Sequence, residues 1–309
     1  MLKGWTEAHS AQFQKDIMTF DHGLGDTGLF TDDALALLLE KHPSNLLDVC
    51  TRGKANDAKY PNKLRTGDFR DCSGADLIAA AKEGWIWINM REAMNVHPEY
   101  KDVLDSMYGG IADETGFKAY NPKGGILITS PVARTPYHFD KTEVVLWHIR
   151  GRKRVYIYPL EEKFISDEVF EQVLINPIND DLPYEKAFDK DATIIDLEEG
   201  QAATWPLNSP HRVENNEFCV SVTTEYSTRE SGLKNAAMIA NATFRQKFGR
   251  SSGYSEQSDT GRLVRSVFGR TIKKAGLAAT IKPKDYVSFK IDPDVPGFIV
   301  DTEPFERNF

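Results

Sequence analysis

The chain has 309 residues, of which 40% are hydrophobic and 27% charged, and its formal net charge at neutral pH is −8. This composition excludes a disordered, collagen-like or disulfide-rich chain, and the acidic balance argues against a whole-chain nucleic-acid binder. The start of the chain has no apolar run typical of a signal peptide, and no apolar stretch is long enough to span a bilayer. Three cysteines lie far apart, at positions 50, 72 and 219. We therefore expect a cytoplasmic protein with no disulfide framework and no membrane partner.

The N-terminal part of the chain mixes helix and strand signals. Thr31, followed by two aspartates and then leucines at helical spacing, predicts a helix start. The capping-box pattern of residues 73–76 predicts a second helix. Aromatic and β-branched residues at 85–89 favour a strand. A third helix is expected after it, with Pro98 near its start and Gly109-Gly110 at its end.

The middle of the chain is dominated by short β-rich runs separated by turn residues. Gly151 and Gly200 are typical of the turns that join two such runs. Many short strands with little helical periodicity between them favour an antiparallel barrel or a jelly roll. We expect strands near residues 125–130, 136–141, 143–150, 153–158, 193–197, 201–205, 211–214 and 217–227.

The C-terminal part is basic and again has a helical pattern. Residues 229–290 contain 13 Lys and Arg against 4 Asp and Glu, a net charge of +9. Because the whole chain has a net charge of −8, the rest of it carries a net charge of −17. Three features are consistent with this charge. They are a solvated helical face, pairing with the acidic part of the same or a partner chain, and a surface for an anionic ligand. Nucleic acid is the less favoured partner because few aromatic residues are interleaved. The prolines of the last twenty residues predict an extended tail.

Three residues have the spacing of a metal site. Residues two apart in a strand point to the same face, so His138 and Asp140 can converge on one ion. His211 begins a later β-rich run and is the best candidate for a third ligand. Two imidazoles and one carboxylate form the facial triad of non-haem Fe(II) oxygenases, which leaves coordination positions open. By themselves, the three residues are also compatible with surface or core positions.

The sequence around these residues resembles a known family. The runs TPYHFD, LWHIRGRKRVYIYP, IDLEEGQAATWPLNSPHRVEN and VSVTTEY, in this order, are similar to JmjC-type, cupin-fold oxygenases that depend on Fe(II) and 2-oxoglutarate. The bacterial cupin-like proteins and the asparaginyl hydroxylases are the nearest branches. The resemblance covers residues 124–228 and, more loosely, the strand at 85–89. It implies a mainly β fold, a double-stranded β-helix with flanking N-terminal and C-terminal helices.

The resemblance also implies a division of the chain and an activity. Residues 1–123 would pack on the β-helix of 124–228, and 229–309 would add helices, an extended tail and a possible dimer interface, as in a homodimer. The enzyme would use Fe(II), 2-oxoglutarate and O2, release succinate and CO2, and hydroxylate a C–H bond. The substrate would be a protein or peptide residue or an amino-acid-like small molecule, or the reaction would be N-demethylation. A non-catalytic cupin-fold binding protein and a metal-dependent cupin enzyme that does not use 2-oxoglutarate are the competing hypotheses.

Individual roles follow from matching positions. His138, Asp140 and His211 match the iron ligands of the family. Thr135 and Lys153 match the hydroxyl and the lysine that bind the far carboxylate of 2-oxoglutarate, whose charge must be neutralised inside a barrel. Thr135 is also a plausible turn residue before a proline.

Other positions have weaker matches. Arg152 and Arg154 alternate with Lys153, so either the lysine or the arginines point inward. Trp87 matches an aromatic residue over 2-oxoglutarate that is a tyrosine in relatives, although a strand tryptophan is often simply core. Asn89 could reach the cosubstrate or the substrate.

The remaining polar residues near the motif are assigned no ligand role. We expect His148 to be a hydrogen-bonded core residue, and Tyr137 and Arg134 could meet a substrate. Glu143 and Val144 stand where relatives place substrate-contacting polar residues, so no substrate is inherited from the family. The other histidines are expected at the surface or at helix caps: His9, His22, His42 and His97.

Overall fold

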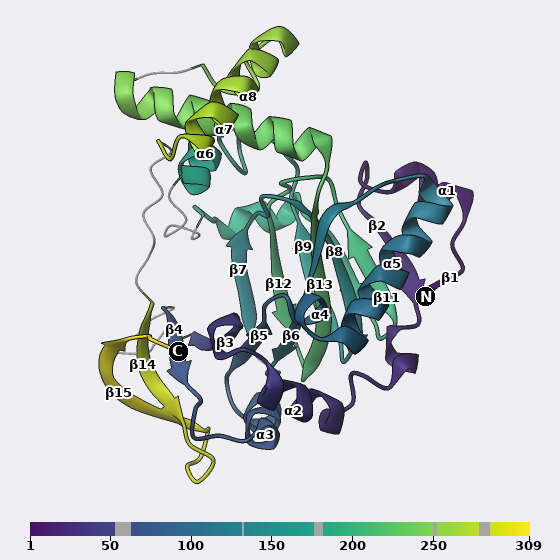
Figure 1. The fold of residues 1–309 in the computed structure, drawn as a ribbon, viewed down its shortest axis with the longest axis vertical. Helices are drawn as coiled ribbons and strands as arrows, with labels where there is room; N and C mark the ends of the chain where they lie inside the picture. Colours follow the sequence, from purple (N-terminus) through teal and green to yellow (C-terminus); the bar gives the residue numbers. More distant parts are fainter. Residues whose placement is uncertain (53–62, 132, 176–181, 250–251, 278–284) are drawn as a thin grey trace.

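The computed structural model describes residues 1–52, 63–131, 133–175, 182–249, 252–277 and 285–309. Two facing sheets form its centre (Figure 1). Eight strands of these sheets belong to the barrel: β6 (Tyr120–Thr129), β7 (Arg134–His138), β8 (Glu143–Arg150), β9 (Lys153–Ile157), β10 (Thr193–Leu197), β11 (Gln201–Thr204), β12 (His211–Asn215) and β13 (Cys219–Ser227).

The order of these strands confirms the predicted double-stranded β-helix. The larger sheet contains the order β11-β8-β13-β6 and the smaller sheet the order β10-β9-β12-β7, so most consecutive strands lie in opposite sheets. The β8–β9 turn depends on Gly151, whose φ is 82°. A Cβ there would lie 2.2 Å from the carbonyl oxygen of Phe218. Only glycine fits this turn, which sets the inward face of β9.

Segments from both ends of the chain extend the larger sheet. β1 (Leu2–Lys3) and β2 (Met18–His22) continue it beyond β11. Beyond β6 it continues with β5 (Trp87–Met90), β3 (Leu47–Arg52), β4 (Leu64–Asp68), β14 (Tyr286–Ile291) and β15 (Ile299–Glu306). Four of these flanking strands, β3, β4, β14 and β15, lie outside the stretches in which the sequence predicted strands.

The helices begin and end largely where their capping residues predict. They are α1 (Glu7–Gln12), α2 (Asp32–Lys41), α3 (Gly74–Glu83), α4 (Ala93–Val96), α5 (Pro98–Thr115), α6 (Asp167–Ile175), α7 (Arg229–Phe248) and α8 (Asp259–Lys274), with short 3-10 turns η1 (Leu24–Thr27), η2 (Ser44–Leu46) and η3 (Lys186–Lys190). Thr31 caps α2, and Ser73 forms a capping box with Asp76 on α3. None of the described helices has both the length and the apolar character needed to cross a bilayer.

The predicted end of the long helix at Gly109-Gly110 is wrong. Helix α5 continues to Thr115 and ends at Gly116, whose φ is 67°. Met107 and Ile111, on either side of the glycine pair, are completely buried in the main core. This burial offsets the roughly 1 kcal/mol that each glycine costs within a helix.

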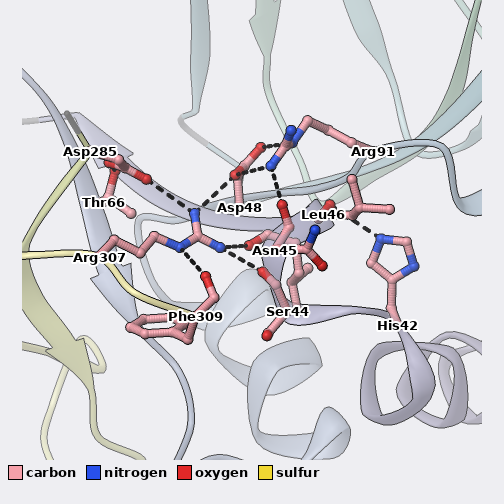
Figure 2. A network of polar contacts seen from close by, with 11 residues as sticks. His42, Ser44, Asn45, Leu46, Asp48, Thr66, Arg91, Asp285, Arg307 and Phe309 are labelled. Atoms are coloured by element: carbon pink, nitrogen blue, oxygen red, sulfur yellow. Dashed lines mark hydrogen bonds and ion pairs between the residues drawn. The ribbon is translucent and has the colours of Figure 1, made fainter. Parts of the chain in front are cut away.

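The C-terminal residues form an ordered hairpin and not only an extended tail. β14 pairs in parallel with β4 and antiparallel with β15. Arg307, whose side chain is 6% exposed, holds the end of the chain in place (Figure 2). Its guanidinium donates to the carbonyls of Ser44 and Leu47 and pairs with Asp48. The last strands are thus fixed to the segment that leads into β3.

Candidate active site

The three predicted metal ligands lie together at one end of the barrel. β7 ends at His138, Asp140 follows two residues later, and β12 begins at His211. Nε2 of His211 lies 3.3 Å from the Asp140 carboxylate, and Nε2 of His138 lies 4.0 Å from it. The three potential ligand atoms are all within 4.8 Å of one another. The antiparallel pairing of β12 with β7, which sets His211 opposite His138, thus brings together residues from two separate parts of the chain.

Backbone carbonyls orient both imidazoles. Nδ1 of His138 donates to the carbonyl of Pro136 at 2.8 Å, and Nδ1 of His211 donates to that of Ser209 at 3.1 Å. With the proton on Nδ1, each ring keeps the Nε2 lone pair free on the side of Asp140. This is the arrangement in which histidine binds a metal and a second group fixes its tautomer. Burial, together with the nearby His138, lowers the pKa of His211 to about 4, so its ring is neutral at neutral pH.

The donor set therefore fits a divalent first-row metal. Two neutral imidazole nitrogens and one carboxylate suit Fe(II), Mn(II), Co(II) or Zn(II). Asn208 supports the arrangement by donating to the backbone carbonyl of Asp140 at 2.8 Å. Trp205 packs against the His211 ring with a centroid distance of 4.6 Å. His138 and Asp140 are about one-quarter exposed, so one side of the cluster is open.

A cavity of about 490 Å³ adjoins the open side of the triad. Its walls come from β3, β4 and β5 on one side and from β7 and the following loop on the other. His138 and Asp140 line it, together with Thr135 and Trp87, two of the residues expected to bind the cosubstrate. The described lining residues are Thr51, Arg52, Leu64, Trp85, Ile86, Trp87, Ala133, Arg134, Thr135, Pro136, His138, Phe139, Asp140, Lys141, Val173, Leu182 and Glu225.

Lys153, and not its arginine neighbours, points into the barrel. It is 4% exposed, whereas Arg152 and Arg154 pair outside with Glu198 and Asp196. Among the described residues no carboxylate pairs with Lys153. Burial lowers the pKa of its ammonium group to about 8. A buried cation without a counterion is costly unless an anionic ligand completes the site.

A short hydrogen-bonded chain fixes the position of Lys153. Its Nζ donates to Oγ of Ser221 at 2.8 Å, and that hydroxyl lies 3.0 Å from Nδ1 of His148. Nε2 of His148 donates to the carbonyl of Gly151 at 2.7 Å, so Nδ1 accepts from Ser221. Burial and the charge of Lys153 lower the pKa of His148 to about 3. The prediction that His148 is a hydrogen-bonded core residue is confirmed.

The two predicted residues on β5 differ in what surrounds them. Trp87 lines the cavity, and its buried indole Nε1 has no hydrogen-bond partner among the described residues. Asn89 lies two residues further along the same face, beside Gly125, and does not line the cavity.

The remaining histidines mostly stand at helix ends. His9 belongs to the capping box of α1, and His42 and His97 flank α2 and α5. The prediction is wrong for His22, which is 2% exposed and donates to the carbonyl of His148. It lies inside because β2 continues the large sheet, a pairing that the sequence did not predict.

Fold and site together define a jelly-roll barrel with a His-Asp-His triad at its open end that could hold a metal ion. Two crystal structures of YcfD from Escherichia coli, one described as a ribosomal oxygenase, have similar folds. The TM-scores are 0.51 and 0.50, the identities 16% and 15%, and the matches cover 89% of this chain and 69% and 68% of those chains. No protein-family model matches the chain, and no curated protein matches its sequence. The likeness to YcfD therefore concerns the fold.

Proposed function

We propose that the protein is an Fe(II)- and 2-oxoglutarate-dependent hydroxylase. The observation that carries this proposal is an oriented His-Asp-His triad in the same barrel as a buried lysine that has no carboxylate partner among the described residues. A metal site alone would suit many reactions. The Lys153 ammonium group inside the barrel also requires an anion, and the far carboxylate of 2-oxoglutarate would supply it.

Each residue would have a distinct task. His138, Asp140 and His211 would hold the iron on one side and leave the cavity side for cosubstrate and O2. Lys153 would neutralise the far carboxylate of 2-oxoglutarate, with a hydrogen bond from Thr135 and with Trp87 packed beside it. Asn89 would support this wall of the barrel. Bound Fe(II), 2-oxoglutarate and O2 supply the oxidising chemistry, with succinate and CO2 as coproducts.

We propose a residue of a protein or peptide as the substrate. The ribosomal oxygenase YcfD shares this fold, and the cavity is large enough for a long side chain. Hydroxylation is the expected outcome, and N-demethylation would be recognised by release of formaldehyde. The three cysteines are free thiols, which supports a site of action in the cytoplasm.

Anaerobic spectroscopy tests the proposal directly. Fe(II) and 2-oxoglutarate added to the protein should give the weak visible charge-transfer band of the chelate, and admission of O2 should yield succinate. His138→Ala should abolish the band, and the matched variant His9→Ala should retain it because His9 lies on α1 outside the barrel. Absence of the band in the wild-type protein would contradict the proposal. A band with no succinate formed in any substrate screen would favour the competing hypothesis of a non-catalytic cupin-fold binding protein.

We also propose that α7 and α8 form a homodimer interface. Helix α8 turns its small residues Ser266 and Gly269 toward α7 and large apolar residues toward solvent. A Cβ at Gly269 would meet the carbonyl of Ala236, so the two helices pack very closely. The outward residues are Leu263, Val264, Val267 and Phe268, which are 57%, 49%, 59% and 52% exposed. Such a stripe fits a second copy of the same hairpin.

Light scattering tests the dimer. Val267→Glu should convert the dimer to a monomer, whereas Leu37→Glu, at a leucine on α2 that is 55% exposed, should have a much smaller effect. A wild-type protein that is monomeric at all concentrations tested would rule the interface out.

A further inference from the structure

We propose that the segment between β9 and β10 positions the three metal ligands from the outer side of the barrel, and that Phe170 and Asp189 are its positioning residues. The structure describes this segment over residues 158–175 and 182–192, which contain α6 and η3. Phe170 and Asp189 do not line the cavity, and the mechanism described above does not use them. The inference rests on the metal site of the proposed function and adds to it the residues that hold the ligands in place.

Three residues that adjoin the ligands in the chain are buried on the outer side of the smaller sheet. Two of them belong to an apolar cluster that is separate from the cluster inside the barrel. The three are Tyr137 before His138, Phe139 between His138 and Asp140, and Arg212 after His211. The backbone here determines where the ligand atoms lie, because both imidazoles are hydrogen-bonded through Nδ1 to nearby backbone carbonyls. Metal ligands must be held within about 0.5 Å of the productive geometry.

The turn after β7, which carries two of the ligands, is held by two contacts from this segment. The Tyr137 hydroxyl donates to the backbone carbonyl of Phe164 at 2.9 Å. The ring of Phe139 stacks on that of Phe170 of α6, with centroids 4.3 Å apart and an interplanar angle of 13°. These contacts restrain the backbone on both sides of His138.

The third ligand is held through the residue that follows it. The Arg212 guanidinium lies 3.4 Å from the ring centroid of Tyr156 and donates to the hydroxyl of Tyr158 at 2.9 Å. It also donates to the carboxylate of Asp189, on η3, at 2.8 Å, and both side chains of this ion pair are largely buried. Charge-assisted hydrogen bonds fix the direction of a planar guanidinium as well as its position. They therefore restrain the start of β12 at His211.

The sheet by itself supports the ligands only on one side. In the described part of the chain, β7 is the edge strand of the smaller sheet and pairs with β12. This pairing is irregular, because its register shifts between His211 and Val213. An irregular ladder bends and twists the strand that carries it. Contacts from outside the sheet are therefore needed to hold the two ligand-bearing strands in a fixed relation.

The rival hypothesis is that the segment only covers the apolar outer face of the smaller sheet. Apolar packing would be enough for such a cover. A buried ion pair often adds no more stability than apolar side chains of similar volume, and its best-supported use is to fix one arrangement among several. The ion pair of Arg212 with Asp189 lies directly beside a ligand, which favours the positioning role.

Binding of Co(II) to the full chain, without 2-oxoglutarate and without oxygen, tests the inference. A titration followed by the visible d–d absorption reports both the affinity and the coordination geometry. We expect Phe170→Leu and Asp189→Asn each to weaken Co(II) binding about tenfold, the effect of losing a group that supports a metal ligand. We also expect the absorption to change, which a loss of stability alone would not produce.

Each of the two variants has a matched control in the same segment. Phe164→Leu also removes a ring from the apolar cluster but keeps the backbone carbonyl that accepts from Tyr137. Asp191→Asn makes the same change of charge at a carboxylate that pairs with Lys163, at the surface. We expect both controls to bind Co(II) within about twofold of the wild-type affinity. Urea unfolding of the metal-free proteins measures the loss of stability, which a mere cover would share between test and control variants.

Two outcomes would overturn the inference: wild-type affinity and absorption in Phe170→Leu and Asp189→Asn, or an equal loss of Co(II) affinity in the controls. If Phe170→Leu does not fold, Asp189→Asn decides, since asparagine keeps the size of aspartate. A wild-type protein that binds Co(II) but gives no charge-transfer band with Fe(II) and 2-oxoglutarate would contradict the hydroxylase and leave the positioning role standing. A wild-type protein that binds no Co(II) would overturn both.

Discussion

Lys153 is a residue at which stability and proposed function oppose each other. The ammonium group is buried without a counterion, which disfavours the folded state, and the same property makes it a receptor for an anion. We predict that Lys153→Met stabilises the metal-free protein by about 1–3 kcal/mol and greatly weakens 2-oxoglutarate binding. Urea unfolding measures the first effect and the charge-transfer band the second. A destabilised variant would mean that the hydrogen bond to Ser221 matters more than the buried charge.

The pH dependence of cosubstrate binding follows from the same group. The pKa of Lys153 lies near 8 in the folded protein and near 10.5 in an unfolded chain. Between these two pKa values the unfolded state binds more protons than the folded state. The free energy of unfolding of the ligand-free protein therefore rises with pH. The affinity for 2-oxoglutarate should change in the opposite direction, falling about tenfold between about pH 7 and about pH 9 as the ammonium group loses its proton. Calorimetry with the Mn(II) protein measures it. A Lys153→Arg variant that still binds should lack this fall.

At the residue scale, strand alternation predicted the pairing of His138 with Asp140, whereas Thr135, Lys153 and Trp87 were expected from the family resemblance. It placed His138 and Asp140 on one face and left Lys153 and its arginine neighbours as alternatives, which the structure decides for the lysine. The unpartnered indole of Trp87 could not be predicted because it depends on packing across two strands.

At the scale of elements, the C-terminal hairpin depends on one side chain. The Arg307 guanidinium is nearly buried and binds two carbonyls and two carboxylates, so its removal leaves several acceptors without a donor. We predict that Arg307→Ala costs about 2–4 kcal/mol and speeds amide hydrogen exchange in β14 and β15. Arg154→Ala is the matched control, since Arg154 is 43% exposed and pairs with Asp196 on β10. Equal exchange in the two variants would contradict this role.

Local sequence patterns predicted helices and strands well where characteristic residues stood at both ends of the element. The capping residues of α2 and α3 and the glycine turns of the barrel fixed boundaries within a few residues. Helix α5 passed through a glycine pair because its buried face outweighed the local preference. β4 and β14 were missed because a parallel pairing of distant segments leaves no mark in either segment alone.

At the scale of the whole molecule, ligands of the triad should stabilise the fold. A metal that joins β7 to β12 binds the native state only, so stability rises with ligand concentration, by about 2.7 kcal/mol at a hundredfold excess over the dissociation constant. We predict that Mn(II) with 2-oxoglutarate raises the melting temperature of the wild-type protein and not that of His211→Ala. Scanning calorimetry measures the shift. An equal rise in both proteins would place the metal elsewhere.

The position of the last residues has a consequence for synthesis. Arg307 hydrogen-bonds to a carbonyl 260 positions earlier in the chain, and β14 borders the strand that carries Leu64 in the cavity wall. The ribosome makes the N-terminal partner of this contact long before it makes Arg307. The nascent polypeptide therefore holds an uncovered edge of the sheet beside the cavity until β14 and β15 have been synthesised.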